Sequence, residues 1–454
     1  MFASERDIAP TLGQVLAALS RALDLTEGLA PGHAARTARI ALRLARELQL
    51  SKAECESLYY AALLKDSGCS SNSARIYPVF GADDVMTKRD VKFVDWSSKG
   101  ASMNFAIKHV APGGSVGAKL RKLAGMMGPP SKVMDEVTKA RCTRGAMVAR
   151  SLGMSEDTAM AIQALDEHWD GKGAPAHLAG RNIPLAARIL CLSQTLEVFA
   201  TAYGMYAGFD VAQERSGRWF DPELVQAALS FENDTAFWRD HSRHVYGEPI
   251  VTVEPESADT QDARTIDQVC ETFATIVDAK SSFTGEHSAR VAEYAVALGR
   301  YFGYREWQIN DLRRAGLLHD LGKLGVPNSV LDKPGRLDEE EFALVKKHPQ
   351  HSYDILSQIR GFERIAEVAA AHHERLDGRG YWKGLGAESL DLDMRILAVA
   401  DVFDALRAAR PYRGALPLDE VFAIMERESE SALDPACVRG LQETYGSMPV
   451  PLAA

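Results

Sequence analysis

The chain has 454 residues, of which 46% are hydrophobic and 25% charged, so it is long enough for two or three globular domains. Its formal net charge of −10 argues against a broad nucleic-acid-binding surface, and hence against a nucleic-acid polymer as partner, but is compatible with a local basic pocket. Because no apolar run reaches about 18 residues, no signal peptide pattern opens the chain and no CxxC pair occurs, we expect a cytoplasmic protein with reduced thiols and no membrane anchor.

Helical periodicity dominates the chain from end to end. Apolar residues recur every three or four positions in "RTARIALRLARELQL" (36–50), "SARVAEYAVALGRYFGY" (288–304) and "EEEFALVKKHPQHSYDIL" (339–356). The clearest strand-like piece is "EPIVTVEP" (248–255), followed by the polar stretch "ESADTQDART". We therefore predict an all-α fold with a linker near residue 255, which divides the chain into domains 1–250 and 251–454.

The two halves carry matching signatures. His33 opens "HAARTARIA" and His287 opens "HSARVAEYA", and the interval from His33 to Asp66 in "LLKDSG" equals that from His287 to Asp320 in "LLHDLG". Each half also has an Asp-Gly-x-Gly segment, beginning at Asp170 or Asp377, and an Arg follows both segments at one and the same interval. Matched motifs at matched spacings predict a duplicated helical domain.

The first copy is longer in the middle than the second. Asp66 and Arg141 are much further apart along the chain than the corresponding Asp320 and His348. The additional residues, near 70–137, include "IYPVFGADDVMTKRDVKFVDWSSKG", which we expect to form a long loop or lid.

Candidate metal ligands are concentrated in the second half. Imidazole nitrogens and carboxylate oxygens suit divalent ions such as iron, manganese, nickel and zinc, and a carboxylate can bridge two ions. Adjacent His-Asp and His-His pairs can supply a ligand to each of two ions, an arrangement that activates water against phosphoesters. The candidates are His287, His319, Asp320, His348, His372, His373 and Asp401. Three further histidines have no other candidate ligands near them in the sequence, and we expect them at the surface: His168, His177 and His241.

Other residues around these candidates could contact a phosphate. Lys323 lies one helical turn after His319, where its ammonium could neutralise a phosphate oxygen, although an exposed Lys at a helix end is an equally good interpretation. Arg379 and Arg410 could act similarly, and Gly378 and Gly380 would let the backbone approach a substrate or simply form a tight turn.

Together these segments resemble a known family. "HSARV", "LLHDLGKLGVPNSVLDKPGRL", "KKHPQHSYDIL", "HHERLDGRGYWKGL", "RILAVADVFDAL" and "RPYR" are similar to the motifs of HD-GYP phosphodiesterases over about residues 265–440. These bacterial enzymes of the HD superfamily hydrolyse cyclic dinucleotides, chiefly cyclic di-GMP. The resemblance implies an all-α fold, an iron or manganese centre, and hydrolysis of cyclic di-GMP to the linear dinucleotide pGpG and then to GMP.

The resemblance also assigns roles to individual residues. It places the seven candidates at the family's metal ligands, with Asp320 as the bridging carboxylate and Lys323 as the phosphate-facing lysine. We expect Asp320 and Lys323 to act in catalysis, and Lys323, Arg379, Gly380, Tyr381 and Arg410 to contact the substrate. Glu374 would orient the ligands from behind. Members with three ions have a Glu where this chain has Phe283, so two divalent ions are expected. The family's Gly-Tyr-Pro is Gly380-Tyr381-Trp382, which leaves the path of that loop and the substrate open.

The first half retains few of these residues. Its aligned positions carry Lys65 for His319, Cys69 for Lys323, Arg141 for His348, Leu165 and Asp166 for the His pair, and Gln194 for Asp401. Only His33 and Asp66 remain, so we expect a degenerate HD domain that binds no metal and serves to sense a ligand, form a homodimer or cover the active half. Two alternatives to a cyclic di-GMP phosphodiesterase stay open: an enzyme for cyclic GMP–AMP or another nucleotide, and a non-catalytic cyclic-dinucleotide receptor.

Overall fold

The computed structural model of the chain describes residues 10–70, 84–95, 98–109, 117, 130–245, 263–281, 285–333, 335–408, 414–429 and 431–446. These residues form two compact units, an N-terminal unit of Pro10–Thr265 and a C-terminal unit of Ile266–Val326 with Val330–Ala454. The expected domain boundary at 250 and the strand-like segment 248–255 lie outside the described residues.

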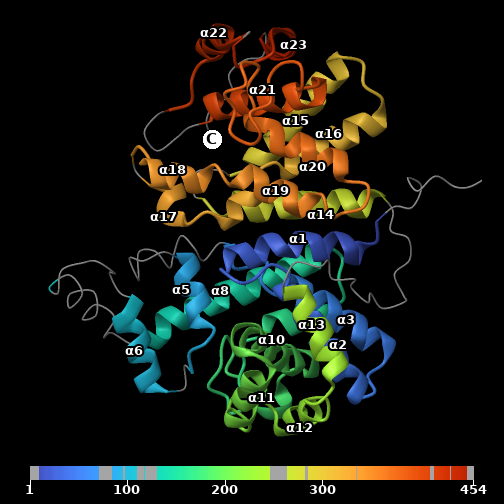
Figure 1. The fold of residues 1–454 in the computed structure, drawn as a ribbon, viewed down its shortest axis with the longest axis vertical. Coiled ribbons are helices and arrows are strands. Elements are labelled where there is room, and N and C mark those ends of the chain that lie inside the picture. The colour runs from blue at the N-terminus through green and yellow to red at the C-terminus, as the bar shows by residue number, and fades with distance from the viewer. Residues whose placement is uncertain are drawn as a thin grey trace, which may run out of the picture. The chain divides into compact units, whose positions relative to one another are not determined.

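The N-terminal unit is helical (Figure 1). Its helices are α1 (Leu12–Thr26), α2 (His33–Glu47), α3 (Lys52–Leu64), α5 (Asp84–Val91), α6 (Lys99–His109), α8 (Pro130–Ser151), α9 (Glu156–Gln163), η3 (Gly180–Asn182), α10 (Leu185–Tyr203), α11 (Met205–Glu214), α12 (Pro222–Leu229) and α13 (Thr235–Val245).

The C-terminal unit is helical as well. Its helices are α14 (Ala263–Asp278), α15 (His287–Tyr301), α16 (Glu306–Leu318), η4 (Leu321–Gly325), α17 (Asn328–Leu331), α18 (Glu339–Val345), α19 (His348–Leu356), α20 (Glu363–Ala370), η5 (Ala371–His373), α21 (Leu392–Arg407), α22 (Leu418–Glu428) and α23 (Pro435–Tyr445). The all-α prediction is confirmed, since the described residues contain isolated β-bridges but no strand.

The two units repeat the same central packing. In the N-terminal unit α2 packs against α3 and α10, and in the C-terminal unit α15 packs against α16 and α21. Both first histidines, His33 and His287, begin a helix directly after a residue in the left-handed region, Gly32 (φ 87°) and Glu286 (φ 58°). This shared backbone turn presents each histidine ring at a helix start.

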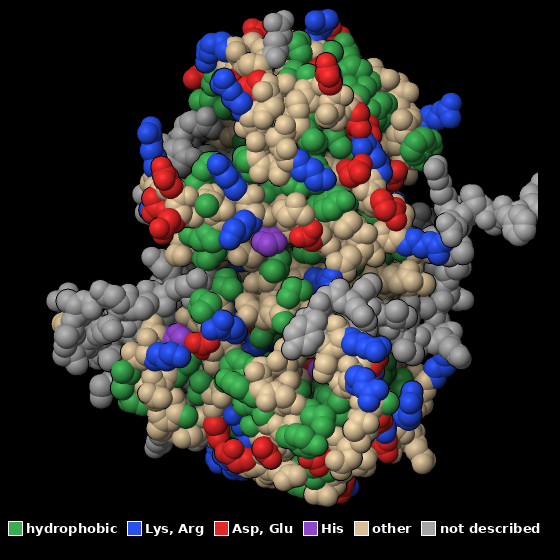
Figure 2. All heavy atoms as spheres, viewed as in Figure 1, with side chains coloured by type: hydrophobic (Ala, Val, Ile, Leu, Met, Phe, Trp, Pro, Cys, Tyr) green, Lys and Arg blue, Asp and Glu red, His purple; other side chains and the backbone are tan. Residues whose placement is uncertain are grey.

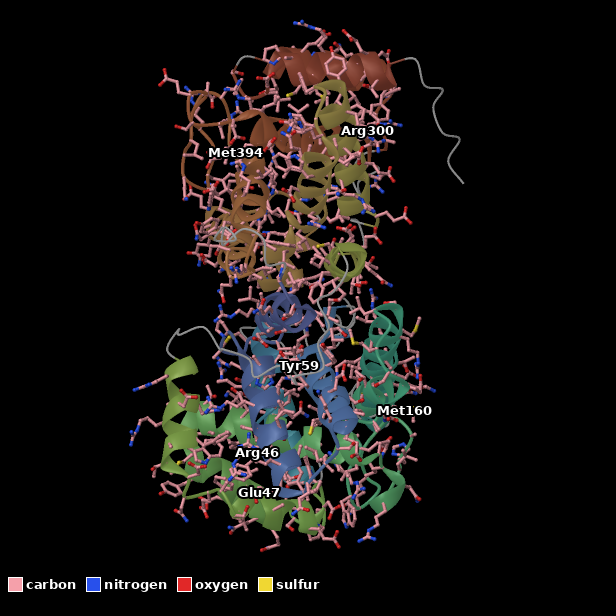
Figure 3. All side chains as sticks on the ribbon, turned by 90° about the vertical axis from the view of Figure 1, so that its right-hand side faces the viewer. Arg46, Glu47, Tyr59, Met160, Arg300 and Met394 are labelled. Carbon is pink, nitrogen blue, oxygen red and sulfur yellow. The ribbon has the colours of Figure 1, made fainter. Side chains whose placement is uncertain are left out.

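Local sequence signals set where these helices begin. Thr11 forms a capping box with Gln14 at α1, as Ser51 does with Glu54 at α3. The apolar faces of the helices then fill the interiors: Tyr59 on α3 is 1% exposed and Met394 on α21 is 6% exposed (Figure 3). These buried faces, rather than intrinsic propensity alone, stabilise the helices.

The segment 339–356 is helical as expected and forms two helices, α18 and α19, because the chain turns at Lys346–Lys347 and Pro349 can only occupy the first turn of a new helix. One expectation about local structure is wrong. The insertion near 70–137 is not a long loop where it is described, since it contains α5 and α6.

Among the helices that the structure describes, one is long and apolar enough to be a candidate membrane span by length and composition. It is α10, and 61% of the apolar window lies inside the N-terminal unit, as in the core helix of a folded domain. On the face shown in Figure 2, acidic and basic side chains are interspersed over both units.

Candidate metal centre

All seven candidate ligands lie together in the C-terminal unit. They come from helix ends and from one helix interior, so the short connections between helices bring them close. His287 begins α15, His319 and Asp320 follow α16, His348 begins α19, His372 and His373 end η5, and Asp401 lies within α21.

Three of the histidines are oriented by the same backbone interaction. The Nδ1 atoms of His319, His348 and His372 each donate to the carbonyl oxygen three residues earlier, at 2.7, 2.6 and 2.6 Å. A carbonyl oxygen can only accept, so Nδ1 carries the proton and Nε2 presents a lone pair. The fold therefore fixes the tautomer that a metal ligand needs.

The lone pairs of two of these rings face each other. Nε2 of His348 lies 3.1 Å from Nε2 of His372. Two unprotonated nitrogens repel unless a cation lies between them. Two nitrogens about 2.1 Å from one ion and at right angles would be about 3.0 Å apart, so this separation fits a shared divalent ion.

The two carboxylates divide the cluster into two sets of ligands. Oδ2 of Asp320 lies 3.6 Å from His287 Nε2 and 3.4 Å from His319 Nε2, whereas Oδ1 lies 3.4 Å from His348 Nε2 and 3.7 Å from His372 Nε2. Each oxygen of Asp320 thus faces a different pair of histidines, the geometry of a carboxylate that bridges two ions.

Asp401 shows the same division. Its Oδ1 lies 3.3 Å from His287 Nε2, and its Oδ2 lies 4.0 Å from Nδ1 of His373. Ligand atoms within 4.8 Å of one another accordingly form three overlapping triads: His287, His319 and Asp401; His319, Asp320 and His372; and His348, His372 and His373.

Two buried atoms support a cation at this place. His319 Nε2 and Asp320 Oδ1 are buried and have no hydrogen-bond partner in the structure. An unsatisfied buried polar atom costs about 1–3 kcal/mol, and a divalent ion would satisfy both at once. The donor set of imidazoles and carboxylates, with no thiolate, suits a divalent metal ion of the first transition row.

The protonation states also fit ligands. Burial lowers the pKa of His348 and His372 well below the usual value and that of His373 to about 3, so these rings are neutral. Burial would raise the pKa of Asp320, but its interactions with His319, Lys323 and His287 hold it well below the usual range. The carboxylate is therefore ionised.

His287 is held from behind by two residues that sequence reasoning missed. Its Nδ1 lies 2.7 Å from Oδ2 of Asp404, whose other oxygen accepts from Nε of Arg290 at 2.6 Å. Burial lowers the pKa of His287, but its contacts with Asp320, Asp401 and Asp404 outweigh this and raise it well above the usual value. An ion at Nε2 would displace the added proton and leave the ring oriented by Asp404.

Only some of the residues expected to contact the substrate lie beside the ligand cluster. Lys323 directs Nζ to Oδ2 of Asp320 at 2.5 Å, beside the cluster, and the ring of Tyr381 lies 4.8 Å from that of His373. Arg379 is exposed, and its backbone N–H donates to Asp377. Arg410 lies outside the described residues, as does Phe283.

Glu374 has a clear structural role. Its buried carboxylate accepts the backbone N–H groups of Lys383, Gly384 and Leu385 at 2.6, 3.1 and 2.9 Å, and so shapes the loop that follows the His pair. Gly380 packs directly on it, since a Cβ there would lie 2.2 Å from Glu374 Oε2. The residue acts on the loop rather than on a metal ligand.

The N-terminal unit keeps this framework without the ligands. Glu167 accepts from residues nine and eleven positions later, as Glu374 does, and Glu197 pairs with His33 and Arg36, as Asp404 does with His287 and Arg290. The signal was available in the sequence, because both halves contain His-x-x-Arg.

Basic side chains take the place of ligands there. Nζ of Lys65, at the position of His319, lies 2.8 Å from His33 Nε2 and also contacts Asp66. Lys92, from the insertion, lies 2.9 Å from Glu27 and 3.7 Å from Asp66. A group of Glu27, Asp66 and Cys69 has metal-like spacing, but Lys92 already neutralises its carboxylates.

The expectation of a surface position is wrong for two of the three histidines, which are buried or half-buried. His241 is only 2% exposed, against Trp238, and His168 is half-buried and stacks on Trp219 with ring centroids 4.1 Å apart. Their aromatic neighbours, distant in sequence for His168, account for the burial. His177 is exposed as expected.

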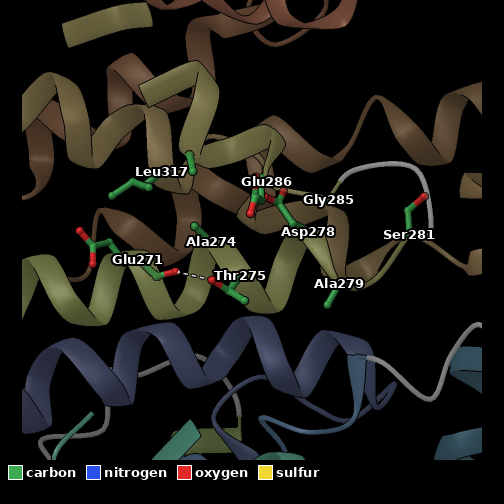
Figure 4. A pocket seen from close by; sticks show the side chains of 10 residues that line it. Glu271, Ala274, Thr275, Asp278, Ala279, Ser281, Gly285, Glu286 and Leu317 are labelled. Carbon is green, nitrogen blue, oxygen red and sulfur yellow. Dashed lines mark hydrogen bonds between the residues drawn. The ribbon is translucent and has the colours of Figure 1, made fainter. Parts of the chain in front are cut away.

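A cavity of about 640 Å³ lies elsewhere in the C-terminal unit (Figure 4). It is lined by α14 and the start of α15, including the acidic side chains Glu271, Asp278 and Glu286, and by none of the seven candidate ligands. An acidic lining repels phosphates, so this cavity is not the place for an anionic substrate.

Comparison with known proteins decides the family. The HD domain family model matches residues 122–224 and 271–437, which is more than half of the chain and falls in both units. The chain belongs to the HD-GYP branch of the HD domain family. The N-terminal unit is its degenerate HD domain, as the missing ligands indicated.

Individual relatives agree with this assignment. The chain is 38% identical over 439 residues to the 3′3′-cGAMP-specific phosphodiesterase 3 of Vibrio cholerae, covering 96% of this chain and 95% of that protein. It is 39% identical over 171 residues to the cyclic di-GMP phosphodiesterase response regulator RpfG of Xanthomonas campestris, covering 37% of this chain and 45% of that one. The crystal structure of a cyclic GMP–AMP-specific phosphodiesterase of V. cholerae matches with a TM-score of 0.66 at 34% identity, covering 97% and 99% of the two chains.

This HD-GYP protein is thus a metal-dependent cyclic-dinucleotide phosphodiesterase in outline. The relatives named above act on cyclic dinucleotides, and HD-family hydrolysis depends on divalent ions.

Proposed function

We propose that the C-terminal unit hydrolyses 3′3′-cyclic GMP–AMP to its linear dinucleotide, using two divalent ions held by the seven ligands. The choice of substrate rests on how much of the chain each relative matches. The cGAMP-specific relative matches both units, whereas the cyclic di-GMP relative matches only 171 residues. Cyclic di-GMP, which the family resemblance favoured, is the second candidate.

The seven ligands fall into two sets, which supports a centre of two ions. His287, His319 and Asp401 would hold one ion; His348, His372 and His373 would hold the other; Asp320 would bridge them through its two oxygens. When bound, the ions would supply an activated water and neutralise the charge that develops on the phosphate oxygens. Iron or manganese fits the donor types.

The chain's own residues position the substrate around this centre. Lys323 is one-quarter exposed and pairs with Asp320, so its ammonium can turn from the carboxylate to a phosphate oxygen when ions neutralise Asp320. Lys346 lies directly after α18, with Nζ 5.9 Å from the centre of the Tyr381 ring. These ammonium groups create a local positive field within an acidic protein, which favours a dianionic substrate.

The N-terminal unit is proposed to have no catalytic role, because Lys65, Lys92 and Arg141 occupy the region of its lost ligands. Sensing, homodimer formation and covering the active half stay predictions for this unit.

Steady-state kinetics on both nucleotides tests the substrate. Protein loaded anaerobically with iron or manganese should cleave 3′3′-cyclic GMP–AMP with a kcat/KM at least about 10-fold above that for cyclic di-GMP, a difference of about 1.4 kcal/mol. The Asp320→Asn variant is the inactive control. A preference for cyclic di-GMP would reverse the assignment, and binding of either nucleotide without turnover, with ions bound, would favour the receptor alternative.

A further inference from the structure

The loop after the His pair differs between the units at one informative position. Asp377-Gly378-Arg379-Gly380 is followed by Tyr381-Trp382, whereas Asp170-Gly171-Lys172-Gly173 is followed by Ala174-Pro175. The N-terminal copy therefore retains the family's proline, and the copy with the ligands has tryptophan. Both loops are held by the same glutamate cradle, so the change is local.

Trp382 makes contacts that proline cannot make. Its indole N–H donates to Oε1 of Gln350 at 3.0 Å, and its ring lies 5.4 Å from that of Tyr353. Nζ of Lys383 lies over both rings, 4.1 Å from the centre of Trp382 and 4.9 Å from that of Tyr353. The loop is thereby fastened by a hydrogen bond, an aromatic contact and a shared cation.

These contacts join two ligand-bearing segments. Gln350 and Tyr353 lie on α19, which begins with His348, and the loop begins directly after His373. Between the attachment points lies Tyr381, whose ring is 4.8 Å from His373 and 6.4 Å from His348. The position of Tyr381 over these two rings depends on how the next residue is anchored.

We propose that Trp382 is a positioning residue that fastens the loop to α19 and holds Tyr381 as a wall of the substrate site. This positioning role rests on the proposed function, and it means that Trp382 affects substrate affinity and the choice between cyclic dinucleotides. It does not touch the ligands themselves, so the ions stay bound when it is changed.

Four variants separate the contacts. Trp382→Ala removes all of them, Trp382→Pro restores the residue found in the other unit, Trp382→Phe keeps a ring without the N–H, and Gln350→Ala removes only the acceptor. Trp307→Ala is the matched control, because Trp307 is a tryptophan of the same unit that is 62% exposed.

The kinetic expectation is a rise in KM with little change in kcat. Trp382→Ala and Trp382→Pro should raise KM for 3′3′-cyclic GMP–AMP by roughly 10-fold, with full metal content. The ratio of kcat/KM for 3′3′-cyclic GMP–AMP to kcat/KM for cyclic di-GMP should change by about 5-fold. Trp382→Phe and Gln350→Ala should give smaller, similar effects. Unchanged KM and ratio in Trp382→Ala would overturn the proposal.

Hydrogen exchange tests the same role without any substrate. The backbone amides of residues 374–386 should exchange faster in Trp382→Ala than in the wild-type protein and in Trp307→Ala. Exchange at the wild-type rate would overturn the positioning role whatever the substrate is. Faster exchange in a protein whose wild-type form cleaves neither nucleotide would support the positioning role and reject the proposed substrate.

Discussion

Nζ of Lys65 lies 2.8 Å from Nε2 of His33, so an ammonium group occupies the place beside the first histidine where the C-terminal unit gathers metal ligands. Lys65 is 1% exposed and also contacts Asp66. The N-terminal unit thus carries a cation of its own chain at this place, which compensates the charge of the buried Asp66 carboxylate beside His33.

Removing this ammonium should destabilise the N-terminal unit. Lys65→Met leaves Asp66 buried with Lys92 as its remaining cation at 3.7 Å, and breaking a buried pair from one side costs about 3–5 kcal/mol. Urea unfolding of the full chain measures the change. Lys172→Met, at a 70% exposed lysine paired with Asp170, is the control and should change stability by at most about 1 kcal/mol. A loss below that level for Lys65→Met would contradict the substitution of metal by lysine.

The same contact predicts a pH dependence. Burial and the Lys65 charge lower the pKa of His33 to about 4, against the contribution of Glu197, so the folded unit holds the ring neutral. The unfolded chain binds the proton near pH 6.5, so this stability is complete above that value and falls as pH drops toward 4. Between pH 7 and 5 the contribution of His33 to the loss of stability should be about 2 kcal/mol, which the difference between the wild type and a His33 variant isolates.

Urea midpoints at pH 7.5, 6.5 and 5.5 measure this slope. The profile should flatten in a His33→Asn variant that still unfolds cooperatively. A slope that His33→Asn leaves unchanged would show that His33 is not its source, because Asp24, whose pKa burial raises to about 7, and His168, whose pKa burial lowers to about 4, titrate in the same range.

The support of His287 by Asp404 should matter for metal affinity. Asp404→Asn keeps the size of the side chain but weakens the carboxylate–histidine pair, and such outer partners typically account for 10- to 100-fold in metal affinity. Competition with a chromogenic chelator measures the change. Glu197→Gln, the equivalent change in the N-terminal unit, is the matched control and should leave the metal affinity unaltered.

The loop shaped by Glu374 offers a pair of glycine variants. A Cβ at Gly380 would lie 2.5 Å from the Cα atom of Glu374, whereas one at Gly386 would meet nothing closer than 3.7 Å. Gly380→Ala should therefore cost about 1–3 kcal/mol of stability and lower kcat/KM, as overpacking does. Gly386→Ala should behave as the wild-type protein, and equal effects of the two variants would reject the close packing of the loop on Glu374.

Residue types and spacings could predict the ligand cluster because metal chemistry is demanding. Few side chains bind divalent ions, and the His-Asp and His-His pairs of the second half occur in motifs where a helix ends. The all-α fold followed equally from periodicity. The equal spacing of His33 to Asp66 and of His287 to Asp320 revealed the duplication.

What the sequence could not provide was the direction of side chains. Asp404 and Arg290 are ordinary charged residues on helix surfaces until α21 and α15 pack together and turn them toward His287. Lys65 is apparent only as a lost histidine, because whether a lysine extends to solvent or into a core depends on the burial of its helix end. The direction of the Trp382 side chain depends likewise on its contacts with Gln350 and Tyr353, which lie on a helix that precedes the His pair.

We propose that two divalent ions balance the buried carboxylates of the C-terminal unit, whereas lysines of the chain balance those of the N-terminal unit. Metal content per folded chain, measured by inductively coupled plasma mass spectrometry on the wild type, Asp320→Asn and Asp66→Asn, distinguishes the two units. We expect two ions in the wild type, loss of both in Asp320→Asn and two still bound in Asp66→Asn. Four ions in the wild type, or a loss in Asp66→Asn equal to that in Asp320→Asn, would show that the N-terminal unit binds metal.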